Sequence, residues 1–316
     1  MAKERKKKKK FFLVRLYHTF LYVFLFFLII TFVWQFYLPS VVFAEPPQRT
    51  STLELRKDGF YTFLLIGSDN GDYNADTIMV VGYDSTTATV NLVSIPRDTL
   101  VSRTWSSFPK INASFSKGID VLAEEVSLTL GIPIDFYVQV GLDAFISVVD
   151  TLGGLEFHVP QDMYHDDEGG FIIDLQEGLQ VLDGRHALEL VRYRGYATAD
   201  IGRTQTQQAV MKALAEQMMT ISNLSKWKSY WEICEEEIKT DLITSDFVWF
   251  AQSVLKEKDS FTLQTHTLTG VGNATYNGYT WCFALDKEAT VEAVNLYLNP
   301  FVTDRTIEDM VILSGQ

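Results

Sequence analysis

A long apolar run near the N-terminus most restricts what this chain can fold into. From Phe20 to Phe43 the sequence FLYVFLFFLIITFVWQFYLPSVVF contains no charged residue. It is longer than the ~20 residues that a bilayer-spanning helix needs. Residues 20–43 are therefore predicted to form a transmembrane helix, so that any folded domain has to come from the residues after it.

The charges around this run predict its orientation. Seven of the first ten residues are Lys or Arg, and such an excess is typical of the cytoplasmic side. Residues 1–19 are thus expected to be a cytoplasmic basic tail, with the C-terminal domain extracellular. The sequence Val42-Phe43-Ala44 weakly resembles a signal-peptidase site, but the apolar run is longer than that of an ordinary signal peptide. A single-pass anchor in the cell membrane is favoured over a cleaved signal.

The rest of the chain is strongly acidic. The first 44 residues hold eight of the 27 basic residues and one of the 40 acidic ones, which leaves 19 basic against 39 acidic residues, a net charge of −20. Such a surface disfavours nucleic acid as a partner. The two cysteines, Cys234 and Cys282, either form one disulfide or remain as two buried thiols.

Short apolar runs and helical patterns alternate after the span. Residues 44–59 are polar and contain prolines, which predicts a short extracellular linker. Strands are expected at 63–67, 77–83, 90–95 and 136–140, with a hairpin between the second and third. Helices are expected to end at Gly131 and Gly153, and a last helix to begin at the N-cap Asp286. This order indicates one α/β domain over residues 60–316.

Charged residues gather where these elements end. Asp69 and Asp76 lie on either side of the loop after the first strand, and Arg97-Asp98 follows Pro96 at the end of the third. Further along the chain come Arg192, Arg194, Asp200 and Arg203. Carboxylates are suited to Mg²⁺, and arginines donate bidentately to phosphate oxygens. The combination predicts a metal-assisted phosphate or pyrophosphate site.

The order of motifs resembles the LytR-CpsA-Psr (LCP) family of Gram-positive cell-envelope proteins. The resemblance covers residues 60–214 and rests on LLIGSD, ADTIMVVGYD, LVSIPRDTLV, KINASFSKG, VDTLGGLEFHVP, GLQVLDGRHALELVRYR and DIGRTQTQQAVMKAL. It implies a single mixed-sheet domain with flanking helices, behind a transmembrane anchor. It also implies an extracellular phosphotransferase that moves an anionic glycopolymer from a polyprenyl-pyrophosphate carrier to peptidoglycan, with both as partners.

The resemblance assigns roles position by position. Asp69 and Asp76 match the acids linked to Mg²⁺, and Arg97, Asp98 and Asp200 are the implied catalytic residues. The implied pyrophosphate-binding residues are Arg97, Lys110, Arg192, Arg194, Arg203 and Gln207. Asp98 and Asp200 both remain candidates for the base that accepts the proton of the attacking hydroxyl.

The chain departs from the family pattern at two positions. Asn74 and Thr206 stand where the family usually has arginines, although each could still donate a neutral hydrogen bond to phosphate. Two rival functions remain: a non-catalytic protein that binds polyprenyl-linked polymer or wall fragments, and a transcriptional attenuator. The attenuator is the weaker alternative, because the predicted cytoplasmic tail is too short for a folded DNA-binding module.

Overall fold

The structure is a computed structural model that describes residues 45–68, 75–166, 172–196, 200–220, 223, 226–257 and 259–315. The predicted tail and transmembrane helix, together with Asp69 and Asn74, lie outside these residues. Within the described ranges, no helix combines the length and the apolar character needed to cross a membrane. The chain divides into two compact units, of which the smaller contains residues 243–252 and the larger contains 48–242 and 253–316.

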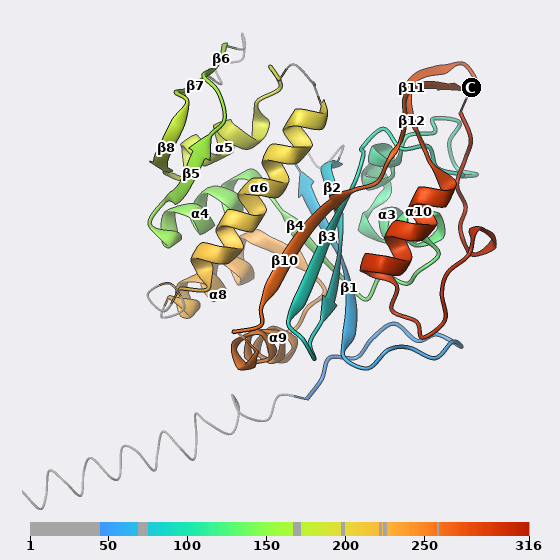
Figure 1. The fold of residues 1–316 in the computed structure, drawn as a ribbon, viewed down its shortest axis with the longest axis horizontal. Helices are drawn as coiled ribbons and strands as arrows, with labels where there is room; N and C mark the ends of the chain where they lie inside the picture. The colour runs from blue at the N-terminus through green and yellow to red at the C-terminus, as the bar shows by residue number, and fades with distance from the viewer. Residues whose placement is uncertain are drawn as a thin grey trace, which may run out of the picture. The chain divides into compact units, whose positions relative to one another are not determined.

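The larger unit is built on a mixed six-stranded sheet with the strand order β10-β3-β2-β1-β4-β9 (Figure 1). The strands are β1 (Phe60–Ser68), β2 (Ala75–Asp84), β3 (Thr89–Ile95), β4 (Phe136–Val140), β9 (Ile238–Thr240) and β10 (Thr262–Thr267). Strands β1 and β4 are parallel, as are β3 and β10, whereas β1–β2, β2–β3 and β4–β9 are antiparallel. The predicted mixed α/β sheet and the β2–β3 hairpin are confirmed.

One face of the sheet packs against helices from two distant parts of the sequence. These are the 3-10 helix η1 (Ile111–Lys117), α3 (Ile119–Leu130), α10 (Lys287–Ala293) and the π-helical turn η2 (Val294–Leu298). The predicted helix limits hold here, since α3 ends at Gly131 with a φ of 65°. Asp286 caps α10 by accepting a hydrogen bond of 2.9 Å from the backbone N–H of Ala289.

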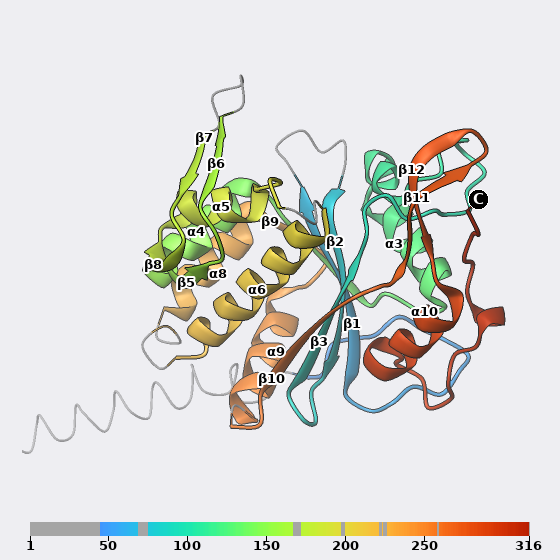
Figure 2. The ribbon, with the colours of Figure 1, turned by 45° about the horizontal axis from the view of Figure 1, so that its top comes forward.

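A second apolar core lies on the other side of the sheet (Figure 2). It joins α4 (Leu142–Leu152), α5 (Gly184–Arg192) and α6 (Asp200–Met218) to two antiparallel strand pairs. These pairs are β5 (Leu155–Val159) with β8 (Gly178–Leu182) and β6 (Met163–Asp166) with β7 (Ile172–Leu175). The buried Gln208 of α6 attaches this layer to the sheet. Its amide nitrogen donates to Ser94 Oγ of β3 at 2.8 Å and to the carbonyl of His266 in β10 at 2.6 Å.

The C-terminal part completes the fold. Helix α8 (Trp227–Glu237) precedes β9, helix α9 (Thr244–Lys256) lies mostly in the smaller unit, and the short 3-10 helix η3 (Ile307–Asp309) comes near the end. The hairpin of β11 (Gly270–Tyr276) and β12 (Tyr279–Leu285) was not predicted. Its turn residues Asn277 and Gly278 have φ values of 49° and 84°, as a two-residue hairpin of this sequence requires. Both cysteines are free thiols, which excludes the disulfide alternative.

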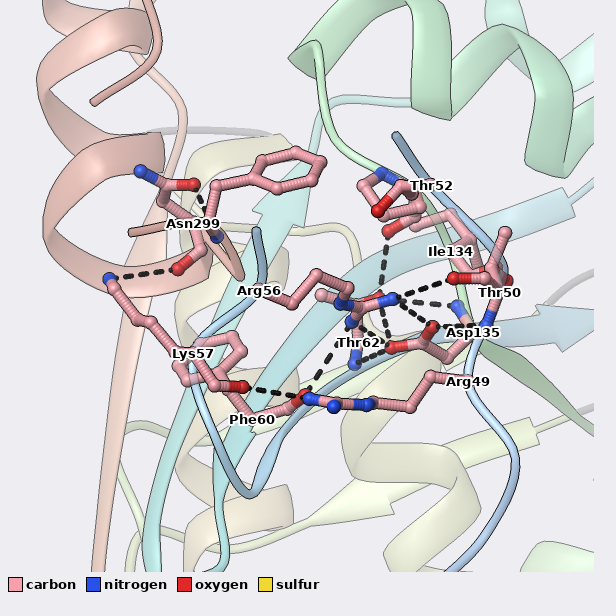
Figure 3. Close-up of polar contacts among 12 residues, drawn as sticks. Arg49, Thr50, Thr52, Arg56, Lys57, Phe60, Thr62, Ile134, Asp135 and Asn299 are labelled. Atoms are coloured by element: carbon pink, nitrogen blue, oxygen red, sulfur yellow. Dashed lines mark hydrogen bonds and ion pairs between the residues drawn. The ribbon is translucent and has the colours of Figure 1, made fainter. Parts of the chain in front are cut away.

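Residues 48–59, within the predicted extended linker 44–59, belong to the larger unit and make polar contacts with the rest of it (Figure 3). Arg56 donates from both terminal nitrogens to the carboxylate of Asp135, each at 2.6 Å. The backbone N–H of Thr50 donates to the same carboxylate at 2.9 Å. Lys57 donates from its backbone N–H to the carbonyl of Pro300 at 2.7 Å. This segment is thereby tied to the chain just before β4 and to the C-terminal region.

Candidate active site

The candidate site lies where β2 begins and β3 ends. The two strands are antiparallel and pair Ile78 with Ile95, so the start of one and the end of the other meet at the same edge of the sheet. Asp76 is the second residue of β2 and Arg97 lies two residues beyond β3. Arg97 Nη1 donates to Asp76 Oδ1 at 2.8 Å. Two of the predicted site residues are thus in direct contact.

Asp98 extends this contact into a row of alternating charges. Its carboxylate accepts from Lys110 Nζ at 3.0 Å, and its other oxygen lies 3.9 Å from Arg97 Nε. The Lys110 side chain is 15% exposed, against 29% for Asp98, so this lysine is held at the site rather than free in solvent. Lys110, which the resemblance implied to bind pyrophosphate, here pairs with the Asp98 carboxylate and fixes its position.

The backbone around Asp98 is held on both sides. On one side, the segment pairs with the chain that leads into η1, through an antiparallel bridge between Leu100 and Lys110. On the other side, the N–H of Phe283 in β12 donates to the carbonyl of Asp98 at 2.8 Å. The N–H of Leu100 donates back to the carbonyl of Phe283 at 2.9 Å. This pairing makes the site more rigid than an ordinary loop after a strand would be.

The chain that links α5 to α6 brings a further arginine to the row. Arg194 Nη2 lies 3.8 Å from Asp76 Oδ1, and its side chain is 57% exposed. Arg192 is the last residue of α5 and is also exposed. Arg194 therefore faces both the site and solvent, where it can reach a ligand.

The first turns of α6 carry the remaining predicted residues. Arg203 is buried, with 5% exposure. Gln207 donates from Nε2 to the carbonyl of Val191 at 3.2 Å, which holds α6 against the end of α5. Asp200 is the first residue of α6. The described contacts thus join Asp76, Arg97, Asp98, Lys110 and Arg194 into one network, whereas the described contact of Gln207 is with Val191.

Thr206 does not take the role expected of it. Its hydroxyl donates to the hydroxyl of Tyr196 at 2.7 Å, and the residue is 6% exposed. A buried hydroxyl that already has a partner is not available to a phosphate oxygen. The expectation that Thr206 substitutes for an arginine at the phosphate is therefore wrong, and its bond to Tyr196 instead packs α6 against the connection that carries Arg194.

The charges of the network favour an anionic ligand. Arg97, Lys110 and Arg194 supply three positive charges against the two carboxylates of Asp76 and Asp98. On a domain of strongly negative net charge, a local excess of cations attracts phosphate groups. Arginine adds a planar arrangement of N–H donors that matches phosphate oxygens.

The same residues fit a magnesium ion that receives few protein ligands. Both arginine contacts of Asp76 reach Oδ1, which leaves Oδ2 for a cation, and the side chain is 42% exposed. Among the described residues no group of three His, Cys, Asp or Glu could hold a metal. Mg²⁺ commonly uses one or two carboxylates together with water and substrate phosphate, so Asp76 suits such an ion.

Sequence reasoning missed a buried ion pair that supports the Lys110 segment. Arg103 Nη2 donates to Glu125 Oε2 at 2.7 Å and to the carbonyl of Lys110 at 3.0 Å, while both side chains of the ion pair are almost fully buried. Burial lowers the pKa of Arg103, although the adjacent Glu125 opposes this shift. A lone arginine in a Ser-rich loop gives no signal of a carboxylate 22 residues further along the chain.

Comparisons with known proteins identify the family. The profile of the LytR_cpsA_psr family matches residues 41–296. The chain belongs to this family. The polyisoprenyl-teichoic acid–peptidoglycan teichoic acid transferase TagU of Bacillus licheniformis is 30% identical over 231 residues, which cover 71% of this chain and 73% of that protein. TagV of Bacillus subtilis, named as the same kind of transferase, is 33% identical over 208 residues, which cover 61% of this chain and 52% of that protein.

The fold agrees with this assignment. The crystal structure of Bacillus subtilis TagV matches with a TM-score of 0.64 and 29% identity, over 75% of this chain and 94% of that one. The predicted family membership is therefore confirmed, and so is the mixed-sheet domain that the resemblance implied.

Proposed function

We propose that this protein is a phosphotransferase of the cell envelope. It would take a glycopolymer, such as a teichoic acid, a capsule or another secondary polysaccharide, from a polyprenyl-pyrophosphate carrier and attach it to peptidoglycan. The observation that carries the proposal is the row Asp76–Arg97–Asp98–Lys110, with Arg194 beside Asp76. The names of the similar proteins TagU and TagV support the donor and acceptor classes.

The cations of the row would bind the diphosphate of the donor. Arg97 and Arg194 both reach toward Asp76, so a diphosphate beside Asp76 receives donors from two directions. These donors stabilise the negative charge that grows on the departing lipid phosphate as the bond to it breaks. Arg192 and Arg203 are proposed to extend the same arginine cluster.

The attack itself needs a base near the acceptor. A sugar hydroxyl of peptidoglycan attacks the phosphorus attached to the polymer, a new P–O bond forms, and the bond from this phosphorus to the oxygen of the lipid phosphate breaks. Asp98 is proposed to accept the hydroxyl proton, because Lys110 and the paired backbone fix its carboxylate beside Arg97. Asp200 remains the second candidate for this base.

We further propose that Mg²⁺ binds at Asp76, with Asp69 as a second ligand. When bound, the ion would neutralise charge on the diphosphate oxygens. The proposed location is the cell membrane, with residues 20–43 as the anchor and the catalytic domain outside the cell. The apolar run and its flanking basic residues support this location.

The test uses the full-length chain in detergent with Mg²⁺, a short-chain polyprenyl-pyrophosphate saccharide and peptidoglycan oligomers. We expect a new phosphodiester product by mass spectrometry, lost on chelation and in the Arg97→Ala variant. Tyr164→Ala, at a 68% exposed position on β6, is the matched control and should retain activity. Tight binding of lipid-linked saccharide without product, across several donors, would contradict the proposal and favour the non-catalytic binding protein.

A further inference from the structure

A cavity lies close to the candidate active site but is not part of it. It has a volume of about 320 Å³, at the lower end of the range typical of small-molecule sites. One wall is the loop of residues 101–109 and the other is the turn of the β11–β12 hairpin. The views agree that this hairpin lies beside the chain that leads into α3 (Figures 1 and 2). Its lining residues are Val101, Ser102, Arg103, Ser106, Ser107, Pro109, Tyr276, Asn277 and Tyr279.

The lining favours a neutral ligand that is rich in hydroxyl groups. It contains three serine hydroxyls, one amide side chain and two tyrosine rings, but no carboxylate. Its single cation, Arg103, already pairs with the buried Glu125 at 2.7 Å. The charge of this one cation is already balanced by Glu125, which disfavours a phosphate in comparison with a neutral ligand. A sugar, in contrast, presents hydroxyls to polar side chains and apolar C–H faces to aromatic rings.

The walls of the cavity are held in place without a ligand. Tyr279 and Ser107 share a hydrogen bond of 2.9 Å between their hydroxyls. The Tyr279 ring also meets Phe108 edge to face, with 5.5 Å between the ring centroids. At the base of the loop, the guanidinium of Arg103 lies over the Trp105 ring at 4.5 Å. Because these contacts fix both walls, little ordering is needed when a ligand binds.

The cavity is connected directly to the site. Val101 lies three residues after Asp98, at most about 10 Å along an extended chain, and Pro109 directly precedes Lys110. The opposite wall is connected to the site as well, because β12, which follows the hairpin turn, pairs with Asp98 and Leu100 through Phe283. A glycan seated here would therefore extend toward the carboxylate proposed as the base.

We propose that this cavity is a saccharide subsite that holds a sugar unit next to the reacting phosphate. The inference rests on the proposed function, since a transferase acting on two glycans needs to position at least one of them. The sugar comes either from the N-acetylated glycan of the cell wall or from the glycopolymer that the lipid carries. The chemistry of the lining is common to both.

The test measures saccharide binding by the full-length protein in detergent, without any donor lipid. The probes are an N-acetylglucosamine tetrasaccharide and maltotetraose, titrated by calorimetry. We expect at least one of them to bind, and Tyr276→Ala to weaken it about tenfold, equivalent to about 1.4 kcal/mol. Binding of only the N-acetylated probe assigns the cavity to the wall glycan. Binding of only maltotetraose assigns it to the carried polymer.

A second variant tests whether any weaker binding by Tyr276→Ala comes only from misfolding. Asn277→Gly removes the amide, but glycine accepts the positive φ of this turn residue. It should also weaken binding, whereas Tyr164→Ala on the distant β6 hairpin should bind as the wild type does. The proposal is overturned if neither probe binds the wild type, or if Tyr276→Ala and Asn277→Gly both bind with unchanged affinity.

Failure of the proposed function gives a different result. Arg97→Ala should lose transferase product and keep saccharide binding, since Arg97 does not line the cavity. A wild-type protein that makes no product from any donor, yet binds a probe in a manner sensitive to Tyr276→Ala, contradicts the phosphotransferase and retains the subsite.

Discussion

The carboxylate of Asp135 should be among the most important single groups for stability in the described structure. It is fully buried, with 0% of its side chain exposed, and it pairs with Arg56, which is 7% exposed. The same carboxylate accepts from the backbone N–H groups of Thr50 and Thr62 at 2.9 and 3.0 Å. It therefore joins the N-terminal segment, β1 and the start of β4.

Replacing Asp135 with alanine should destabilise the protein by about 3 to 5 kcal/mol. Removing one partner of a buried ion pair leaves an uncompensated charge, which typically costs this much. For a domain of this size, each kcal/mol lowers the melting temperature by roughly 2 to 4 °C. We therefore expect a fall of roughly 6 to 20 °C in thermal unfolding of the full-length protein, followed by tryptophan fluorescence.

A double variant separates the charge from the hydrogen bonds. Arg56→Met combined with Asp135→Leu removes both charges and should recover part of the loss, since apolar pairs often replace buried ion pairs at little cost. Recovery should be incomplete, because the buried N–H of Thr62 still lacks an acceptor, at about 1 to 3 kcal/mol. A loss below about 1 kcal/mol in Asp135→Ala would refute this reasoning.

Three further predictions concern charge and protonation. Arg97→Lys should lower transferase turnover by roughly 10- to 100-fold in the product assay, because an ammonium cannot make the bidentate contact of the guanidinium. Activity equal to that of the wild type would show that Arg97 makes no such contact with phosphate. Burial raises the pKa of Cys234 to about 11 from its ordinary 9.0. Because the thiolate is the reactive form, alkylation of Cys234 by iodoacetamide at pH 8 should be about 100-fold slower than that of an unstructured cysteine peptide. Equal rates would show that this thiol is exposed. Burial lowers the pKa of His266, whose ring stacks on Tyr297 at 3.5 Å. Folding therefore disfavours the protonated ring, so stability should fall as the pH drops through the ordinary value of 6.5, and His266→Gln should reduce this dependence in melting curves.

Local patterns in the sequence predicted most of the sheet and several helix ends. Apolar runs of β-branched residues gave the positions of β1 to β4, because a strand buried on both faces needs an almost continuous apolar sequence. Gly131 and Asp286 were recognised because the C-terminus and N-terminus of a helix have distinct chemical requirements. These features depend on neighbouring residues only.

The β11–β12 hairpin shows where such reasoning was incomplete. The Asn277-Gly278 pair between two tyrosines is a strong hairpin signal, so this element could have been predicted. Its position could not, because β12 pairs with residues near Asp98 that are distant in the sequence. The hydrogen bond between the hydroxyl groups of Thr206 and Tyr196 could not be predicted from the sequence either.

Among the site residues, too, positions set by local sequence could be predicted, whereas contacts between distant segments could not. Arg97 and Asp98 could be placed at a strand end from the sequence, and the contact of Arg97 with Asp76 follows from the antiparallel hairpin. The ion pair of Asp98 with Lys110 depends on the bridge between Leu100 and Lys110. No local sequence pattern predicts that bridge.

The hydrogen bond from Phe283 to Asp98 also has a consequence for how the protein matures. Strand β10, which also comes late in the sequence, pairs with β3 at the edge of the sheet. Both this edge and the segment that carries Asp98 are therefore completed only by late parts of the polypeptide. Contacts between residues so distant in sequence form slowly, because a long loop must close first. A nascent chain therefore cannot assemble this candidate site until nearly all of the chain has been synthesised. A product that ends before β12 would have every predicted site residue, but its Asp98 segment would lack the bond to Phe283.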